Sequence, residues 1–362
     1  MMRKEKKVNY DVAVIGGGPS GMISAGRAAE LGAKVVLLEK NDSLGKKLLI
    51  TGKGRCNFTH YEFDRVKLAE KFGKEGRFLY SALDHFGVRE VLNFFQSRGL
   101  TWRVERGNRV FPKEGNAQDV LRILTCYLRE GGVNFFCNCR VSDIEIIQNG
   151  SEKFKIIYSG GELFSEKVIL STGGKSYSQT GSSGDGYHWA EKFGHTIINP
   201  EPSLNPVETA EKWVKEVQGL TLKNVSLQLY LEGRKCDERF GEMLFTHFGI
   251  SGPIVMDMSK SIAQHLKKGK VKLVLDLKPA LNFQKLEERI QRDFQEFKGR
   301  MFKNSLQKLL PASLIPVIIR LSAIEEEKKV DYITKEERKR LVHLIKELEL
   351  TPTELLGFSW AM

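Results

Sequence analysis

The stretch Val12-Ala13-Val14-Ile15-Gly16-Gly17-Gly18-Pro19-Ser20-Gly21 decides the fold of this chain. Its apolar beginning predicts a strand that is buried on both faces of a parallel sheet. The glycine turn runs into residues 22–31, which favour a helix, and residues 35–38 predict a second buried strand. Together these segments predict a βαβ unit, which indicates an α/β fold of the Rossmann type.

The glycines of this turn have the G-x-G-x-x-G spacing of a dinucleotide-binding site. Gly16 permits the tight turn, Gly18 lets the backbone approach a pyrophosphate, and Gly21 lets the helix pack closely on the strand. The pyrophosphate is then expected against the free N–H groups at the start of the helix, beside Pro19 and Ser20. Because the turn lies between a predicted strand and a predicted helix, the motif has the context that it requires.

Glu39 closes the second strand, where a carboxylate accepts hydrogen bonds from ribose hydroxyls. A carboxylate there disfavours a 2′-phosphate, so FAD or NAD is preferred to NADP. A second glycine-rich, basic loop follows at residues 51–59, with the sequence TGKGRCNFT. An NAD-dependent dehydrogenase has no need of such a loop, whereas a flavoprotein must line its pyrophosphate, ribityl and isoalloxazine groups. The residues therefore favour FAD.

Within this loop, Lys53 or Arg55 would supply a cation near the pyrimidine edge of the flavin, where it stabilises the anionic reduced form. Pairing with an ordinary phosphate or carboxylate is an almost equal alternative for Arg55. Cys56 lacks a C-x-x-C partner, so a buried and inert thiol is expected.

Further along the chain, the apolar pattern predicts a helix over residues 77–99 with Phe78 and Phe86 on its buried face. Alternating residues at 225–231 and 271–277 predict half-buried antiparallel strands. Thr334 and Glu337 form a capping-box pair ahead of another helix.

Residues 46–57 resemble the signature of the BaiN/YhiN-like flavoproteins, a family of NAD(P)/FAD-dependent oxidoreductases also described as the aminoacetone oxidase family. Residues 109–112, 170–187 and 245–253 are similar to further motifs of that family. The resemblance covers essentially the whole chain.

The resemblance implies a Rossmann-like two-dinucleotide-binding flavoprotein fold with an inserted domain. The FAD-binding domain would comprise residues 1–203 and 354–362. The inserted domain, residues 204–353, would be β-barrel-like with a helical excursion at about 281–327. The resemblance also implies non-covalent FAD and hydride transfer through it. The chain has no second G-x-G-x-x-G, so NAD(P)H, if it is the electron donor, is expected to bind transiently.

Arg55 and His247 are the candidate catalytic residues; His247 could face the flavin as a proton donor or orienter or, equally well, be a structural histidine. Thr172 could approach the cofactor or only end a strand, and Asp185 could bond a ribityl hydroxyl or only cap a helix. No histidine or cysteine spacing suggests a metal. The expected cofactor contacts are Gly16, Gly18, Pro19, Ser20, Gly21, Glu39, Lys40, Lys47, Lys53, Gly54, Arg55, Cys56, Asn57, Val141, Thr172, Gly173, Gly174 and Asp185.

Members of the resembled family normally continue beyond residues 358–361 with a glycine-rich strand and a motif that contacts the flavin. We therefore expect a truncated chain with weak or absent FAD retention. Two alternatives to an FAD-dependent oxidoreductase acting on a small molecule stay open, namely an FAD-dependent tRNA-modifying enzyme and a non-catalytic remnant of a flavoprotein.

Composition narrows the partners and the location. The net charge is +12, from 57 basic and 45 acidic residues spread along the 362-residue chain. This spread favours a solvated surface that attracts anionic cofactors, and a nucleic-acid partner is not expected. No apolar stretch approaches the roughly 20 residues that span a bilayer. The 5 cysteines are irregularly spaced, which is typical of a protein in the reducing cytoplasm.

Overall fold

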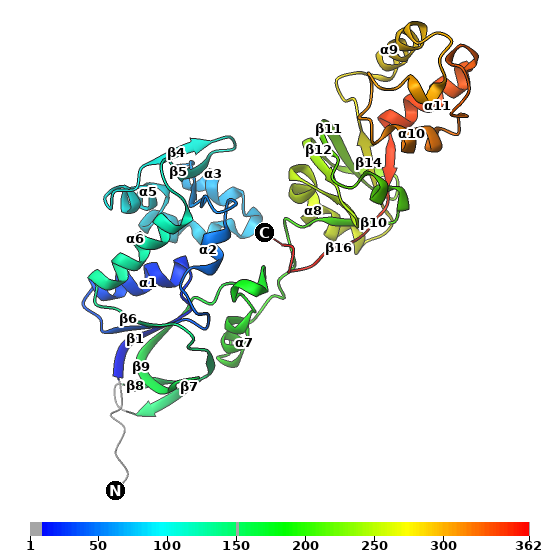
Figure 1. Cartoon of the computed structure of the whole chain (residues 1–362). Helices are drawn as coiled ribbons and strands as arrows, with labels where there is room; N and C mark the ends of the chain where they lie inside the picture. Colours follow the sequence, from blue (N-terminus) through cyan, green and yellow to red (C-terminus); the bar gives the residue numbers. More distant parts are fainter. Residues whose placement is uncertain (1–8, 150–151, 362) are drawn as a thin grey trace. The chain divides into compact units, whose positions relative to one another are not determined.

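The computed structural model describes residues 9–149 and 152–361. The chain divides into two compact units, Met1–Asn199 and Pro200–Met362. Each unit has its own sheet and its own hydrophobic core (Figure 1).

The first unit is built on a 6-stranded sheet with the order β6-β2-β1-β9-β8-β7. β2, β1 and β9 run parallel, as does β6 beside β2, while β8 and β7 extend the sheet in antiparallel fashion. The predicted βαβ unit is confirmed. The strands are β1 (Asn9–Ile15), β2 (Val35–Leu38), β6 (Asn134–Phe136), β7 (Val141–Asn149), β8 (Glu152–Tyr158) and β9 (Gly161–Leu170).

Helices cover both faces of this sheet. α1 (Pro19–Glu30) and α6 (Ala117–Glu130) pack on one face, where Met22 and Leu124 share a buried cluster with Val14 and Leu37. α7 (Asp185–Lys192) contributes Trp189 to the cluster on the other face. Short helices α2 (Lys46–Ile50) and η2 (Ser178–Thr180) follow the ends of β2 and β9.

A 3-stranded antiparallel sheet, in the order β3-β5-β4, forms a second layer of the first unit. Its strands are β3 (Thr59–His60), β4 (Trp102–Glu105) and β5 (Arg109–Pro112), and beside them lie α3 (Arg65–Glu70), η1 (Gly73–Leu79), α4 (Tyr80–His85) and α5 (Val88–Gln96). The prediction of one helix over residues 77–99 is wrong, because α4 ends before Gly87 and α5 begins after it. Phe78 and Phe86, predicted to be buried, are 89% and 43% exposed.

The second unit contains a 7-stranded sheet in the order β15-β14-β11-β12-β13-β10-β16. Its two edge strands, β15 (Leu348–Leu350) and β16 (Pro352–Leu355), are consecutive in the chain and separated only by Thr351. This connection brings the two ends of the sheet together, as expected for the predicted β-barrel-like domain. The other strands are β10 (Val207–Thr209), β11 (Thr221–Leu231), β12 (Arg234–Phe245), β13 (Gly249–Ser251) and β14 (Val271–Asp276).

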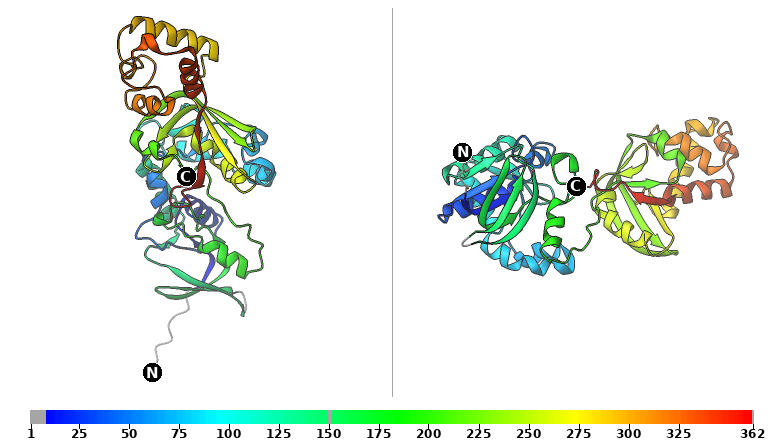
Figure 2. Two further views of the ribbon diagram at one scale, coloured as in Figure 1. Left: turned by 90° about the vertical axis from the view of Figure 1, so that its right-hand side faces the viewer. Right: turned by 90° about the horizontal axis from the view of Figure 1, so that it is seen from below.

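A helical segment is inserted between the neighbouring strands β14 and β15, and its helices lie together beyond one end of the barrel (Figure 2). It extends to Lys346, further than the predicted residue 327, and the predicted capping box of Thr334 and Glu337 begins its last helix. The segment comprises α9 (Phe283–Glu296), η4 (Phe302–Asn304), α10 (Ile315–Ser322), η5 (Val330–Tyr332) and α11 (Lys335–Lys346), while η3 (Lys212–Val217) and α8 (Pro253–Leu266) pack on the barrel.

The domain boundaries predicted from the sequence stay a prediction. The structure places the described part of residues 354–362 in the second unit, where β16 pairs with β10 and Asn205 Nδ2 donates to the Gly357 carbonyl at 2.6 Å. In residues 9–149 and 152–361, no helix is both long enough and apolar enough to cross a membrane.

Candidate active site

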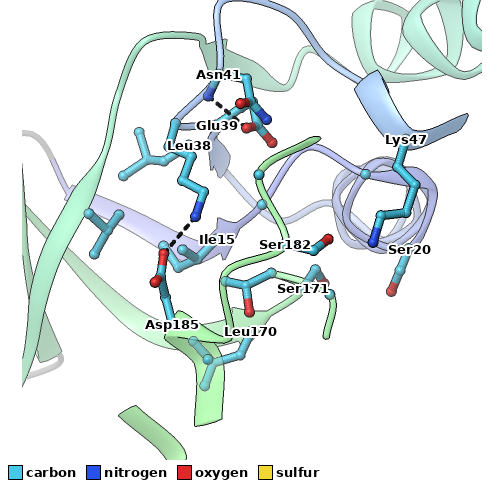
Figure 3. A pocket seen from close by; sticks show the side chains of 18 of the residues that line it. Ile15, Ser20, Leu38, Glu39, Asn41, Lys47, Leu170, Ser171, Ser182 and Asp185 are labelled. Atoms are coloured by element: carbon cyan, nitrogen blue, oxygen red, sulfur yellow. Dashed lines mark hydrogen bonds and ion pairs between the residues drawn. The ribbon is translucent and has the colours of Figure 1, made fainter. Parts of the chain in front are cut away.

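A cavity of about 510 Å³ opens in the first unit at the carboxyl ends of β1, β2 and β9 (Figure 3). β1 connects through α1 to β2 on one side, and β9 lies on its other side. Such a reversal of strand order opens a crevice, which is where open α/β sheets bind their ligands. The cavity has the size of a small-molecule or cofactor site.

Three glycines shape the wall of this cavity at the start of α1. Gly16 has a φ of +107°, and a Cβ added to it would lie 2.4 Å from the Ser171 carbonyl oxygen. A Cβ on Gly21 would lie 1.9 Å from the Gly16 carbonyl oxygen, so Gly21 is required for packing. A Cβ on Gly18, in contrast, would meet no described atom within 4 Å. The open space at Gly18 fits a phosphate group that must approach the backbone at a helix N-terminus.

Glu39 is held rigidly at the end of β2. Its Oε2 atom accepts the Gly17 N–H at 2.6 Å and its Oε1 atom accepts the Asn41 N–H at 2.8 Å. The side chain is only 7% exposed. Each carboxylate oxygen has a second acceptor site, so the oriented carboxylate can still accept from a ligand hydroxyl.

An ion pair spans the cavity from β2 to α7. Lys40 Nζ lies 2.8 Å from Asp185 Oδ2, the ion pair that a dashed line marks at Asp185 in Figure 3. The Ser183 hydroxyl donates to Asp185 Oδ1 at 2.8 Å. Burial acts to raise the pKa of Asp185, but the hydrogen bonds from Lys40 and Ser183 outweigh it and lower the pKa. Asp185 is the first residue of α7, and its side chain bonds Lys40 and Ser183.

Lys47 brings a second cation to the cavity, on the side of α1 where Ser20 lies (Figure 3). Its Nζ atom donates to the Ser176 carbonyl at 2.6 Å, and burial lowers its pKa. A desolvated ammonium close to a helix N-terminus attracts an anionic group more strongly than one in water does.

The structure brings most of the predicted contacts together. The cavity is lined by Gly16, Gly18, Pro19, Ser20, Glu39, Lys40, Lys47, Val141, Thr172, Gly173 and Asp185. Gly21 lies behind the wall, in the packing of α1 on the turn. Gly174 and residues 53–57 do not line the cavity.

The loop that suggested FAD contacts the small sheet, and its predicted contacts with the cofactor stay predictions. Arg55 Nη1 bonds both carboxylate oxygens of Glu105 at 3.0 Å, and its guanidinium lies 4.3 Å from the Phe111 ring centroid. Lys53, Gly54 and Asn57 belong to the same turn, in which Lys53 has a φ of 60°. Cys56 is buried, and burial raises the pKa of its thiol to about 11, which agrees with an inert thiol.

His247 lies in the second unit, so Arg55 and His247 belong to different units. The imidazole is exposed and packs edge-on against the Phe248 ring at 4.9 Å between centroids. Their predicted catalytic roles stay predictions.

Sequence reasoning missed several residues that line the cavity, namely Asn41, Cys139, Ser171, Ser182 and Tyr187. Asn41 and Ser171 each follow closely the end of a buried parallel strand, and that position is the signal that points to them. Among residues 9–149 and 152–361, no group of acidic, histidine or cysteine side chains is arranged to hold a metal ion.

Comparison with known proteins gives matches along the whole chain. The model of the HI0933-like protein Rossmann domain matches residues 10–274, and that of the HI0933-like protein barrel and H2TH domain matches residues 201–362. A 3-dehydro-bile acid delta(4,6)-reductase of Clostridium scindens is 30% identical over 96% of this chain and 84% of its own length. A ribosomal RNA dihydrouridine synthase of Haemophilus influenzae is 29% identical over 96% of this chain and 83% of its own. A flavocytochrome c3 fumarate reductase structure covers 96% of this chain and 67% of its own, with 13% identity and a TM-score of 0.47.

Proposed function

We propose a function for this chain on the premise that it belongs to the HI0933-like family, the family predicted from the sequence under another name. The predicted class of enzyme, an FAD-dependent oxidoreductase, is confirmed with the family. The identity of the substrate and the roles of single residues are the proposal.

FAD is the cofactor that the cavity would hold, and when bound it supplies the hydride for the substrate. The open space at Gly18 and the N–H groups at the start of α1 receive the pyrophosphate, whose charge Lys47 neutralises. Glu39 accepts from ribose hydroxyls. The ion pair of Lys40 and Asp185 connects β2 with α7 beside the cofactor. The open space at Gly18, at the reversal point of the sheet, is the observation that carries this assignment.

The substrate is a cyclic compound with an activated carbon–carbon double bond. The names of two full-length relatives, a delta(4,6)-reductase and a dihydrouridine synthase, both describe saturation of a ring double bond. The names of these relatives do not assign a bile acid or an RNA to this chain as its substrate. The chemistry that the two names share supports a double-bond reductase. NAD(P)H, bound transiently, is the proposed electron donor.

A uracil base in RNA is a second candidate substrate. Two of the relatives that match over nearly the full chain are named for ribosomal RNA. The sequence-based expectation that nucleic acid is not a partner is not supported by those names, and the net charge of +12 suits a polyanion.

The cofactor assignment is tested by titrating the purified chain with FAD and comparing it with the Gly18→Val variant. Gly18 has a φ of −75° and open space beside it, so valine should leave the fold intact while filling the space for the pyrophosphate. The wild type should bind FAD and the variant should not, with equal thermal stability without FAD. Equal FAD affinity in the two proteins would contradict the assignment. The two candidate substrates are then distinguished by the rate of NAD(P)H oxidation, measured once with a cyclic enone and once with uridine.

A further inference from the structure

The small sheet of the first unit carries a positively charged face that the proposed cofactor site does not use. Arg103 pairs with Phe111 and Glu105 pairs with Arg109 across β4 and β5, and His60 of β3 also pairs with Arg109. Residues directly opposite in antiparallel strands project to the same side, so these side chains share one face. Arg55 joins them through Glu105 and Phe111. We call Arg55, Arg103 and Arg109 the arginine face.

The charge of this face is far from neutralised. Glu105 is the carboxylate shared by Arg55 and Arg103, both at 3.0 Å. Arg106 at the turn and Lys71, which contacts the His60 ring, add two more cations, and the nearby Glu62 adds a second carboxylate. The pKa of His60 is lowered by burial and by Lys71, so the imidazole does not add to the charge. Arg55, Lys71, Arg103, Arg106 and Arg109 therefore outweigh Glu62 and Glu105.

The guanidinium groups are oriented to bind an anion. Arg55 and Arg109 both lie over the buried Phe111 ring, at 4.3 and 5.7 Å from its centroid. Arg109 uses Nε to bond the Arg106 carbonyl at 3.1 Å. Within the part of the chain that the structure describes, both Nη groups of Arg109 and the Nη2 group of Arg55 have no acceptor. A stacked guanidinium with free N–H edges is suited to bidentate binding of phosphate.

Aromatic rings border this face and favour a nucleic acid over other polyanions. Tyr61 directly follows His60 and bonds through its N–H to the Asn108 carbonyl in the β4–β5 turn. Tyr61 and Phe63 are 36% and 46% exposed, and they contact each other at 4.7 Å between centroids. Both residues follow β3, the edge strand of this sheet, and so lie at its rim. The Tyr61 ring also contacts Trp102 at 5.6 Å between centroids, and the Arg89 guanidinium lies 5.7 Å from the Phe63 ring centroid. A single strand that crosses this rim can place phosphates on the arginines and stack a base on these rings.

We infer that the arginine face binds the phosphates of single-stranded RNA, with Tyr61 and Phe63 as a stacking surface for a base. The preference for RNA over single-stranded DNA rests on the proposed function, through its second candidate substrate. The basic residues are spread along the sequence. The fold gathers Arg55, Arg103 and Arg109 on one face, beside exposed aromatic rings.

The test is fluorescence anisotropy with labelled oligouridylate at several salt concentrations. The Arg103→Gln/Arg109→Gln variant should bind on the order of tenfold more weakly, and its log–log salt slope should fall by about 1.4, at about 0.7 per lost phosphate contact. The Tyr61→Leu/Phe63→Leu variant should lose about fivefold in affinity or more with little change in slope. Arg106→Gln, whose exposed side chain has no partner among the described residues, gives a variant that should not disturb folding and should also lower the slope.

Lys223→Gln/Lys268→Gln is the matched control, because it removes the same charge from exposed positions of the second unit. The inference would be overturned if this control lost as much affinity as the arginine variants, or if the arginine variants bound RNA as tightly as the wild type. It would also be overturned if polyglutamate displaced the labelled RNA as well as unlabelled RNA does. FAD binding and double-bond reduction are measured on the same preparations. Cofactor binding and reduction without RNA binding would refute the inference alone, and arginine-dependent RNA binding without FAD binding would refute the proposed function alone.

Discussion

Lys40 and Asp185 are separated by 145 residues, yet the Lys40 ammonium lies 2.8 Å from the Asp185 carboxylate. This ion pair joins the end of β2 to the first turn of α7, and both residues line the cavity. The lowered pKa of Asp185 implies that the contribution of the pair to stability depends on pH.

The Lys40→Met variant should be less stable than the wild type at neutral pH by about 0.5–1 kcal/mol, because the pair is partly exposed. The folded pKa of Asp185 is lowered from its ordinary value of 3.8. The stabilisation is therefore complete above that value and is lost as the pH falls through the folded pKa. Urea denaturation at neutral and acidic pH should show the difference between the proteins shrinking on acidification. The exposed pair of Lys267 and Glu201 offers a control through Lys267→Met, and a difference that grows in acid would contradict the prediction.

Gly21→Ala should destabilise the first unit by about 3 kcal/mol, the upper part of the range for overpacking, because its Cβ would lie 1.9 Å from the Gly16 carbonyl oxygen. Gly18→Ala is the matched control, since a Cβ there meets no described atom within 4 Å. Thermal denaturation without added cofactor should separate the two variants. Equal midpoints would show that the turn tolerates a side chain at either glycine.

Lys346→Met should cost about 3–5 kcal/mol, because it leaves the buried Asp276 carboxylate without its cation. Lys346 Nζ bonds Asp276 at 2.5 Å and the carbonyl oxygens of Lys278 and Leu281, and the lysine side chain is 8% exposed. Lys272→Met removes a similar pair with Glu349 on the surface and should cost less than about 1 kcal/mol. Chemical denaturation of both variants measures the loss of unfolding free energy in each. Similar losses in the two variants would contradict the prediction.

Alkylation should reach the exposed Cys236 long before Cys56. Burial raises the pKa of Cys56 to about 11, so little reactive thiolate is present at mildly alkaline pH. With iodoacetamide at about pH 8, we expect Cys236 to react on the order of a hundred times faster, because Cys56 is buried and its thiol stays protonated. Peptide mass spectrometry follows both sites, and the ratio should collapse in denaturant. Comparable rates in the folded protein would show that the loop at residues 51–57 opens.

The βαβ unit and the glycine turn could be predicted because their signals are local. A run of apolar residues, a turn with G-x-G-x-x-G spacing and a carboxylate after β2 all lie within residues 12–39. The barrel required the family resemblance, since β15 and β16 are consecutive in the chain yet lie at opposite ends of the strand order, an arrangement that no local pattern predicts.

Other features depend on contacts between distant residues. The expected place of Arg55 near the flavin stays a prediction. Its contacts with Glu105, 50 residues away, and with Phe111 could not be predicted from a local pattern. The helix break at Gly87 also escaped the apolar pattern, because Gly87 adopts an extended backbone as the N-cap of α5 and its N–H donates to Glu90 Oε2 at 2.9 Å. Asn41 and Ser171 were missed because their one signal is their position just after the end of a buried strand, and their residue types do not add to it.

The helical segment between β14 and β15 is, in topological terms, an insertion in the connection of a β-hairpin. β14 and β15 are neighbours in the ladder, with Leu275 opposite Leu348, so the segment leaves and re-enters the barrel at adjacent points. The helices share one hydrophobic core with the barrel, in which Leu286 and Ile345 cluster with the strand residues Leu273 and Leu275. A change of length or sequence in this insertion must therefore preserve its packing on the strands.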